Sequence, residues 1–237
     1  MGANAVTTTF DFTAGQILTA AQMDNVNCGV PVFATTVTRD AAFGGAGEKA
    51  LAQGQLAYIE ATNSLQQYSG TAWQSAASMV CVKATTTFSA SAAVLVDSVF
   101  TTAFDTYLIV AEGVAAVAAD AIFLNWRAGG ATNTTSNYNY QYLFANGATV
   151  TASNATGGTF AYISDWGTTR SAFSVLVQTP ATAAPTTTIN QGNRNGNFLF
   201  NSVSSFTAST AFDGFTFKGQ TQNISGQYTV YALGKSI

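Results

Sequence analysis

The sequence predicts a mostly β protein whose C-terminal part is an antiparallel, jelly-roll-like β-sandwich. Only 8% of the 237 residues are charged, and the chain contains no histidine. Polar character comes mainly from Thr, Ser, Asn, Gln and Gly, which suit strands, turns and subunit contacts. Short β-branched and aromatic runs alternate with clusters of these small polar residues over 81–237, without a convincing helical pattern.

For residues 1–31 the sequence predicts an extended arm followed by a short helix, which together form an attachment segment. Thr19 is a candidate N-cap, and Gln22 completes a capping box. Gly29 and Pro31 then end the helical pattern. Such a short helix is marginal alone in water, so we expect it to dock on another surface. The residues expected to form this attachment, including the hydrophobic staple, are Leu18, Thr19, Gln22, Met23 and Val26.

Residues 32–80 predict a small β connector module. Strands are expected at 32–37, 54–59 and 65–68, with a small-residue loop at 41–47. A module of this size has only a thin core, so we expect it to lean on neighbours or on copies of itself. An aromatic cluster that includes Leu56 supplies the expected connector and trimer contacts, which are Tyr58, Tyr68 and Trp73.

Residues 81–237 predict the main domain, the C-terminal sandwich. Turn clusters are expected at 129–137, 154–158 and 191–197. Short strands separated by such turns are typical of two-sheet antiparallel folds. The expected strands are 93–99, 107–112, 121–127, 138–145, 159–162, 172–179, 198–206, 211–218 and 226–233.

Charge and hydropathy argue against nucleic-acid and membrane partners. The net charge is −3 with a pI of about 4.6, and the few cations are scattered. The most apolar stretch, 107–126, is interrupted by polar residues, so no membrane insertion is expected. The N-terminus lacks the pattern of a secretory signal peptide. Cys28 and Cys81 are expected to be buried, reduced thiols of a protein made in a cytoplasm, and a contact between them stays open.

The residue types argue against an enzyme, a metal site or a bound cofactor. Without histidine, the commonest general base and a main zinc ligand are missing. The acidic residues are far apart in sequence, whereas glycosidases need two neighbouring carboxylates. The most site-like grouping is Asp165 with Tyr162, Trp166 and Arg170, for which a turn Asp beside a core Trp is the favoured interpretation.

Tyrosines near the Asn-rich loops are candidate sugar-binding residues. Tyr138, Tyr140 and Tyr142 alternate, so they are expected on one face of a strand. Core packing and a subunit interface are the competing interpretations of these rings. The full set of candidate surface glycan contacts is Tyr138, Tyr140, Tyr142, Tyr162 and Trp166.

Several segments resemble structural proteins of tailed bacteriophages. Residues 12–24 are similar to the "TAG-x-x-LTAAQMN" opening of fibre and baseplate-associated proteins. Residues 54–73 resemble the Tyr/Trp module of tail fibres, "G-x-x-x-Y … L-x-x-Y-x-G-x-x-W". The segments 104–110, 122–126, 137–140 and 226–234 resemble a β-sandwich found at fibre ends. Related domains often read "F-N-G-D" where this chain has 124–127, which leaves the loop geometry open.

The resemblance implies a virion component made in the host cytoplasm. It implies a homotrimeric tail fibre or baseplate appendage that is anchored through its N-terminus to other virion proteins of tail, baseplate or head. The C-terminal domain would then be displayed toward a host cell-surface glycan. A head fibre or capsid decoration protein is the alternative. A polysaccharide depolymerase is disfavoured by the absent histidine and the sparse carboxylates.

Overall fold

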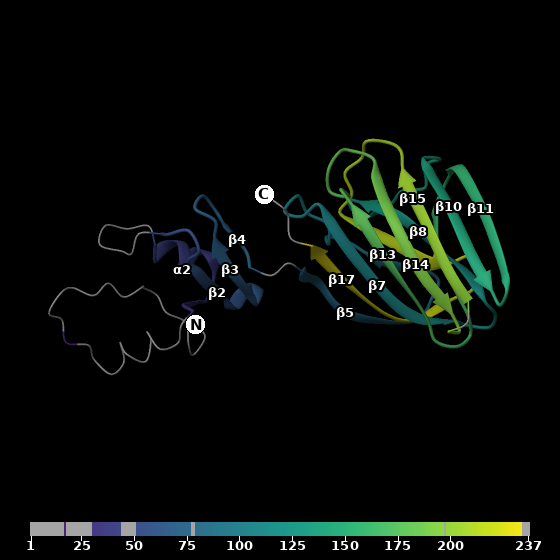
Figure 1. Ribbon diagram of the computed structural model, residues 1–237, viewed down its shortest axis with the longest axis horizontal. Helices are drawn as coiled ribbons and strands as arrows, with labels where there is room; N and C mark the ends of the chain where they lie inside the picture. Colours follow the sequence, from purple (N-terminus) through teal and green to yellow (C-terminus); the bar gives the residue numbers. More distant parts are fainter. Residues whose placement is uncertain (1–16, 18–29, 44–50, 77–78, 197, 234–237) are drawn as a thin grey trace. The chain divides into compact units, whose positions relative to one another are not determined.

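The computed structural model describes residues 17, 30–43, 51–76, 79–196 and 198–233 (Figure 1). The chain forms two compact units, Met1–Ser78 and Met79–Ile237. Among the described residues, no helix has the length and apolar character needed to cross a bilayer. The predicted attachment helix and Cys28 lie outside the described residues, as do the helix's site residues Leu18, Thr19, Gln22, Met23 and Val26.

The first unit contains a four-stranded sheet of order β1-β2-β3-β4. The pair β1/β2 is parallel, and the other pairs are antiparallel. Phe33, Ala57 and Ile59 form its small buried core with Ala42, and Phe43 and Trp73 pack against them. The elements are β1 (Val32–Phe33), α2 (Thr36–Ala41), β2 (Leu56–Ile59), the 3-10 turn η1 (Glu60–Thr62), β3 (Ser64–Tyr68) and β4 (Trp73–Ser75).

The predicted strand at 32–37 is wrong after Phe33, because the chain turns into helix α2. The Thr35 hydroxyl accepts a hydrogen bond from the Thr38 backbone N–H at 3.2 Å, and the Thr35 N–H donates to the Thr38 hydroxyl at 3.0 Å. This reciprocal pair is a capping box that satisfies N–H groups at the helix start. The β-branched composition favoured a strand, but the same threonines serve equally well as helix caps.

The second unit is a β-sandwich of two antiparallel sheets, which confirms the predicted fold class (Figure 1). The larger sheet has the order β11-β10-β15-β14-β13-β7-β17-β5, and the smaller has the order β12-β8-β16-β6 with β9 paired to β8. The strands are β5 (Met79–Ser91), β6 (Val94–Val96), β7 (Thr106–Ala115), β8 (Asp120–Ala128), β9 (Ala131–Thr132), β10 (Tyr138–Asn146), β11 (Thr149–Gly158), β12 (Ala161–Trp166), β13 (Ser171–Gln178), β14 (Thr186–Arg194), β15 (Phe198–Phe206), β16 (Gly214–Gly219) and β17 (Ile224–Leu233).

Three long strands were not predicted, namely β5, β11 and β14. The expected turn at 154–158 lies in β11, and most of the expected turn at 191–197 lies in β14. These segments are rich in Thr, Asn, Ser and Gly, which weakens any strand signal in the sequence. They pair because neighbouring strands supply their hydrogen-bond partners: β11 pairs with β10, and β14 pairs with β13 and β15.

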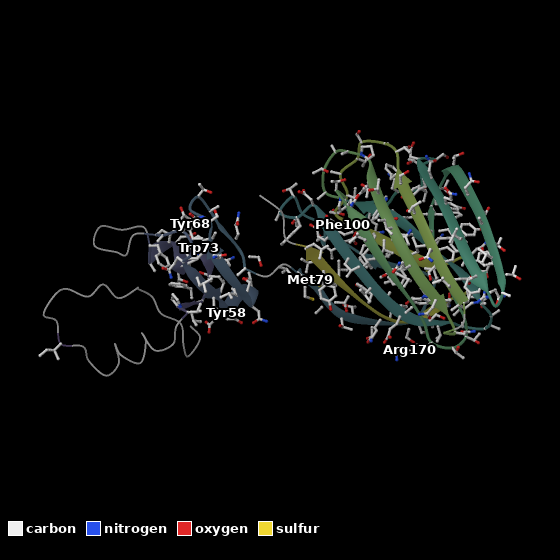
Figure 2. All side chains as sticks on the ribbon, in the orientation of Figure 1. Tyr58, Tyr68, Trp73, Met79, Phe100 and Arg170 are labelled. Carbon is white, nitrogen blue, oxygen red and sulfur yellow. The ribbon has the colours of Figure 1, made fainter. Side chains whose placement is uncertain are left out.

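Aromatic rings dominate the core between the two sheets. Phe100, labelled within the sandwich in Figure 2, packs edge-on against Tyr107 at a centroid distance of 4.8 Å and against Trp126 at 6.1 Å. The Phe215 ring lies 5.8 Å from the Phe100 ring. Buried positions alternate along β13 and β15, as expected for strands that face a core on one side. Each fully buried ring contributes about 1.5–3 kcal/mol to the hydrophobic stabilisation.

Tyr138 and Trp166 belong to this core, so their prediction as surface glycan contacts is wrong. Both side chains are fully buried. The Tyr138 hydroxyl accepts a hydrogen bond from the backbone N–H of Trp126 at 2.9 Å and donates one to the backbone carbonyl of Asn133 at 3.0 Å. Partners within the chain therefore satisfy the Tyr138 hydroxyl, and the competing interpretation of core packing holds for this ring.

Tyr138 is expected to make the sandwich less stable at high pH. Burial raises the pKa of Tyr138 to about 12, with the Trp126 hydrogen bond opposing it. The unfolded chain loses this proton above about pH 10, before the folded chain does, so the free energy of unfolding falls from about pH 10 to 12. Denaturant unfolding at several pH values should show this slope, and Tyr138→Phe should reduce it. An identical slope in both proteins would contradict the assignment.

Cys81 is exposed, which contradicts the prediction of a buried thiol. It lies on β5, an edge strand of the larger sheet, opposite Tyr231 of β17. The next residue, Val82, packs against the core, so strand alternation points Cys81 to the opposite, solvent-facing side.

The loop after 124–127, whose geometry the sequence left open, is held by Arg127 at the end of β8. Its guanidinium makes a bidentate ion pair with Asp97, with distances of 2.6 and 3.1 Å. It also donates to the Thr132 hydroxyl at 2.6 Å and to the Gly130 carbonyl. Gly129 and Gly130 both have positive φ, which glycine adopts without strain. The buried Arg127 side chain thus links the turn residues Gly130 and Thr132 to Asp97.

Candidate functional site

The two sheets differ in width, and this difference leaves part of the inner face of the larger sheet uncovered. Strand β12 is an edge of the smaller sheet, and it packs over β14 and β15. Strands β10 and β11 continue the larger sheet past this edge (Figure 1). On β10, Tyr138 is therefore buried, whereas Tyr140, Tyr142 and Phe144 on the same face are only half-buried.

These rings form a continuous aromatic surface, here called the aromatic platform, consisting of Tyr140, Tyr142, Phe144, Phe160 and Tyr162. The Tyr140 and Tyr142 rings stack with centroids 6.3 Å apart, and Tyr142 stacks with Phe144 at 6.0 Å. Phe160 continues the row at 6.3 Å from Tyr140. Tyr162 of β12 contacts Tyr142 edge-on at 4.8 Å. All five side chains are half-buried, so they combine firm support with an accessible face.

The platform rests on rings that the sandwich holds in place. Phe144 stacks on Phe198 with centroids 5.0 Å apart, and Tyr142 stacks on Phe200 at 5.5 Å. Both supporting phenylalanines are buried on β15, which pairs with β10 along its whole length. Strand alternation, rather than a loop conformation, thus sets the positions of the β10 rings.

A polar cluster lies at one end of the platform. The Tyr162 hydroxyl donates to a carboxylate oxygen of Asp165 at 3.3 Å, and the Arg194 guanidinium approaches the same oxygen at 3.4 Å. The guanidinium also lies 3.9 Å from the centroid of the Phe198 ring, a cation–π contact. Arg194 is the last residue of β14, so strand geometry positions the cation.

Burial controls the protonation of this cluster. It raises the pKa of Asp165 above its ordinary value, while the positive charge of Arg194 opposes the shift. Burial, together with the nearby charge of Asp165, also raises the pKa of Tyr162. Tyr162 therefore stays a hydrogen-bond donor at neutral pH, and the cluster offers one cation and several oxygen acceptors beside the rings.

The carboxylate of Asp120 is not free to act together with that of Asp165. Asp120, whose charge contributes to the raised pKa of Asp165, is buried and accepts hydrogen bonds from the backbone N–H groups of Thr221 and Gln222, each at 2.8 Å. Its oxygens are thus committed to a turn. Among the described residues, no group of three His, Cys, Asp or Glu side chains is placed to hold a metal ion.

Three of the five predicted glycan residues come together on the platform: Tyr140, Tyr142 and Tyr162. The site-like grouping of Asp165 does not include Arg170, which pairs with Glu112 at a rim of the sandwich (Figure 2). The favoured interpretation is right about the core Trp166, but Asp165 lies in strand β12 rather than in a turn. Sequence reasoning missed Phe144, Phe160 and Arg194. The alternation from Tyr138 onward continues to Phe144 and signals that position, whereas Phe160 and Arg194 are brought in by pairing between distant strands.

The predicted connector residues separate onto two faces of the first unit. Tyr68 and Trp73 (Figure 2) are paired across β3 and β4, with ring centroids 5.6 Å apart. The Arg39 guanidinium lies over the Trp73 ring. Tyr58 alternates with the buried Ala57 and Ile59, so it points to the opposite face of the sheet. The single cluster expected from the sequence is therefore wrong for Tyr58 and for Leu56, which shares its face.

No protein-family model matches the sequence, and no curated protein matches it. Among solved structures, the chain is similar to an exo-inulinase from Aspergillus awamori, with 13% sequence identity and a TM-score of 0.32. That likeness covers 76% of this chain but only 34% of the exo-inulinase chain, so this protein spans about a third of its length. By its fold and its platform, this protein is a β-sandwich with an accessible aromatic surface.

Proposed function

We propose that this protein is a structural component of a tailed-bacteriophage particle, a trimeric tail fibre or baseplate appendage that adheres to glycans of the host surface. The N-terminal segment anchors the chain, and the sandwich is the adhesive part. The resemblance of residues 12–24 and 54–73 to phage proteins supports the viral part of the proposal. The aromatic platform is the observation that supports adhesion.

The chemistry of the platform suits a carbohydrate. Sugar rings have an apolar C–H face, which packs on accessible aromatic rings, and a polar rim, which needs hydrogen-bond donors and acceptors. Tyr140 and Tyr142 present the rings, while Asp165 and Arg194 present the polar groups. Because the rings are already packed, little conformational entropy is lost on binding. Display of several copies on one particle converts weak single contacts into strong attachment.

Replacing Tyr142, the central ring, with alanine should weaken adsorption to host cells. Truncation of a central aromatic anchor commonly costs about 2 kcal/mol or more, which is more than a tenfold loss of affinity. The measurement is binding of purified protein to cells of the source culture, followed by fluorescence of a labelled chain. Tyr142→Phe is the matched control, because it keeps the ring and removes only the hydroxyl.

The comparison between these variants separates two explanations. If stacking carries the contact, Tyr142→Phe binds nearly as well as the wild type and Tyr142→Ala does not. Both proteins should give the wild-type circular dichroism spectrum. Full binding by a folded Tyr142→Ala protein would show that the platform is not the adhesive site.

Gold-labelled antibody imaging of particles from the source culture tests the location. Label on the tail or baseplate is the expected result, and label on the capsid would instead favour the head fibre or decoration protein. An absence of label on every particle would remove the viral part of the proposal. A reducing-sugar assay on host capsule tests the depolymerase alternative, and release of sugar ends would require an enzyme.

A further inference from the structure

The other face of the larger sheet carries a second surface with a different character. We call it the outer face: the outward side chains of β11, β10, β15, β14 and β13. The smaller sheet packs against the opposite side, so it leaves this face uncovered. Exposed hydrophobic side chains gather on it and on the neighbouring strand β7, namely Val110, Leu143, Val150, Ile189, Leu199 and Val203.

The strand register lines up apolar residues across the sheet. Tyr231 of β17 is opposite Leu108 of β7, which is opposite Leu176 of β13. The row continues through Ile189 of β14 to Val203 of β15. Ile189 and Val203 are each 52% exposed, at the middle of the uncovered area. A band of this kind, crossing five strands, is unusual for a surface that faces only water.

The polar residues beside this band are amides and hydroxyls. Gln141 and Asn154 extend the apolar row on β10 and β11, and Gln191 and Asn201 are paired in the next row. Among the described residues, the outward side chains of β11, β10, β15, β14 and β13 include no Asp, Glu, Lys or Arg. The neighbouring strand β7 carries Glu112, whose charge is paired with Arg170. Each amide has both donors and an acceptor, so a surface of this composition is complementary to itself.

Two adjoining hollows make this face uneven. One has a volume of about 470 Å³ and the other about 250 Å³, and Gln141, Ile189 and Val203 line both. Side chains of an opposing surface can enter such hollows, which increases the packed area. The outward side chains that line the hollows are aliphatic, amide and hydroxyl groups.

We infer that the outer face is a contact surface between copies of this chain. Five to six strands spaced about 4.8 Å apart, each about 30 Å long, give an area of about 700–900 Å², close to the roughly 800 Å² per partner of a stable interface. An uncharged, amide-rich partner avoids burying an unpaired charge, and a second copy supplies that partner. The inference deepens the multimeric part of the proposed function and is independent of glycan binding.

The test is the mass of the full-length chain in solution, measured by size-exclusion chromatography with light scattering. The wild-type chain should have at least twice the monomer mass of 24.5 kDa. Ile189→Lys with Val203→Lys should shift it toward the monomer and raise the dissociation constant at least tenfold, because two like charges are placed at the centre of the contact. Both positions are half-exposed, so the isolated chain should fold normally, as judged by circular dichroism.

The controls are lysine substitutions at other exposed hydrophobic positions. Leu95 is 56% exposed on β6 of the smaller sheet, and Val117 is 79% exposed outside the strands. Leu95→Lys and Val117→Lys should leave the mass unchanged. A wild-type chain that remains at the monomer mass at every concentration would overturn the inference, as would a folded double-lysine variant that assembles like the wild type. Neither outcome bears on Tyr142, so adhesion is tested separately.

Discussion

Replacing Trp166 with alanine is expected to lower the free energy of unfolding of the sandwich unit by about 3–5 kcal/mol. The indole is fully buried, with Phe173 at a centroid distance of 5.6 Å and Phe217 at 6.3 Å. Phe88 of the edge strand β5 stacks on it at 6.4 Å. Removing the indole leaves a cavity lined by side chains from three other strands, and the surrounding rings cannot collapse to fill it.

The backbone next to Trp166 is shaped to fit it. A Cβ atom added to Gly113 would lie 2.6 Å from the indole and 2.3 Å from the Ser225 carbonyl oxygen. Gly113→Ala should therefore also destabilise the unit, because backbone atoms cannot move aside cheaply. This pair of neighbours shows why an aromatic residue that was predicted to lie on the surface is in fact a centre of the core.

Thermal unfolding measures the effect of Trp166→Ala, and the melting temperature should fall by about 10 °C. Trp166→Phe is the matched control and should cost less, because its ring fills part of the site and the buried indole N–H lacks a hydrogen-bond partner among the described residues. Leu95→Ala, at an exposed position, should change little. Unchanged stability together with lost cell adsorption in Trp166→Ala would restore the original surface prediction.

Replacing Arg127 with methionine is expected to cost about 3 kcal/mol, the lower end for breaking a buried ion pair. The Arg127 side chain is 6% exposed, whereas its partner Asp97 is 41% exposed. Water can therefore partly solvate the remaining carboxylate. The loss also removes the hydrogen bonds to Thr132 and Gly130, so the turn after β8 should become less ordered.

A second arginine provides the control for this experiment. Arg170 pairs with Glu112, but its side chain is 81% exposed. Exposed ion pairs contribute about 0–1 kcal/mol, so Arg170→Met should hardly change stability. Urea unfolding of both variants compares the two pairs directly. Equal losses would mean that burial does not determine the contribution of Arg127.

The fold class was predictable because half of each strand faces the core. In β13 every second residue from Phe173 to Val177 is a buried apolar residue, a period of two that the sequence shows. In β15 the sequence shows less of it, because Ser202 and Ser204 are buried while Val203 between them is exposed. Strand β11 has few buried positions and leaves no such trace. Helix α2 was missed for another reason: Thr35 and Thr38 suit a strand by composition but act as a cap.

The candidate site was predictable only where one strand carries it. Tyr140 and Tyr142 share β10, and their alternation placed them together. Tyr138 continues the same face, yet it passes under the smaller sheet, and no local pattern shows where that cover ends. Arg194 reaches Asp165 because β12 packs over β14, a contact between residues that are far apart in sequence. Such tertiary positions depend on sheet order, which periodicity does not encode.

The sandwich begins and ends at one place, since Met79 of β5 is paired with Leu233 of β17. The strands carrying these residues lie at the opposite edge of the larger sheet from β10, about 25–30 Å away by strand spacing. A fluorescent protein or affinity tag fused after the last strand would therefore emerge beside the start of β5 rather than over the aromatic platform. The same arrangement makes the sandwich unit suitable for fusion to, or insertion into, an unrelated protein, because its first and last strands end next to each other.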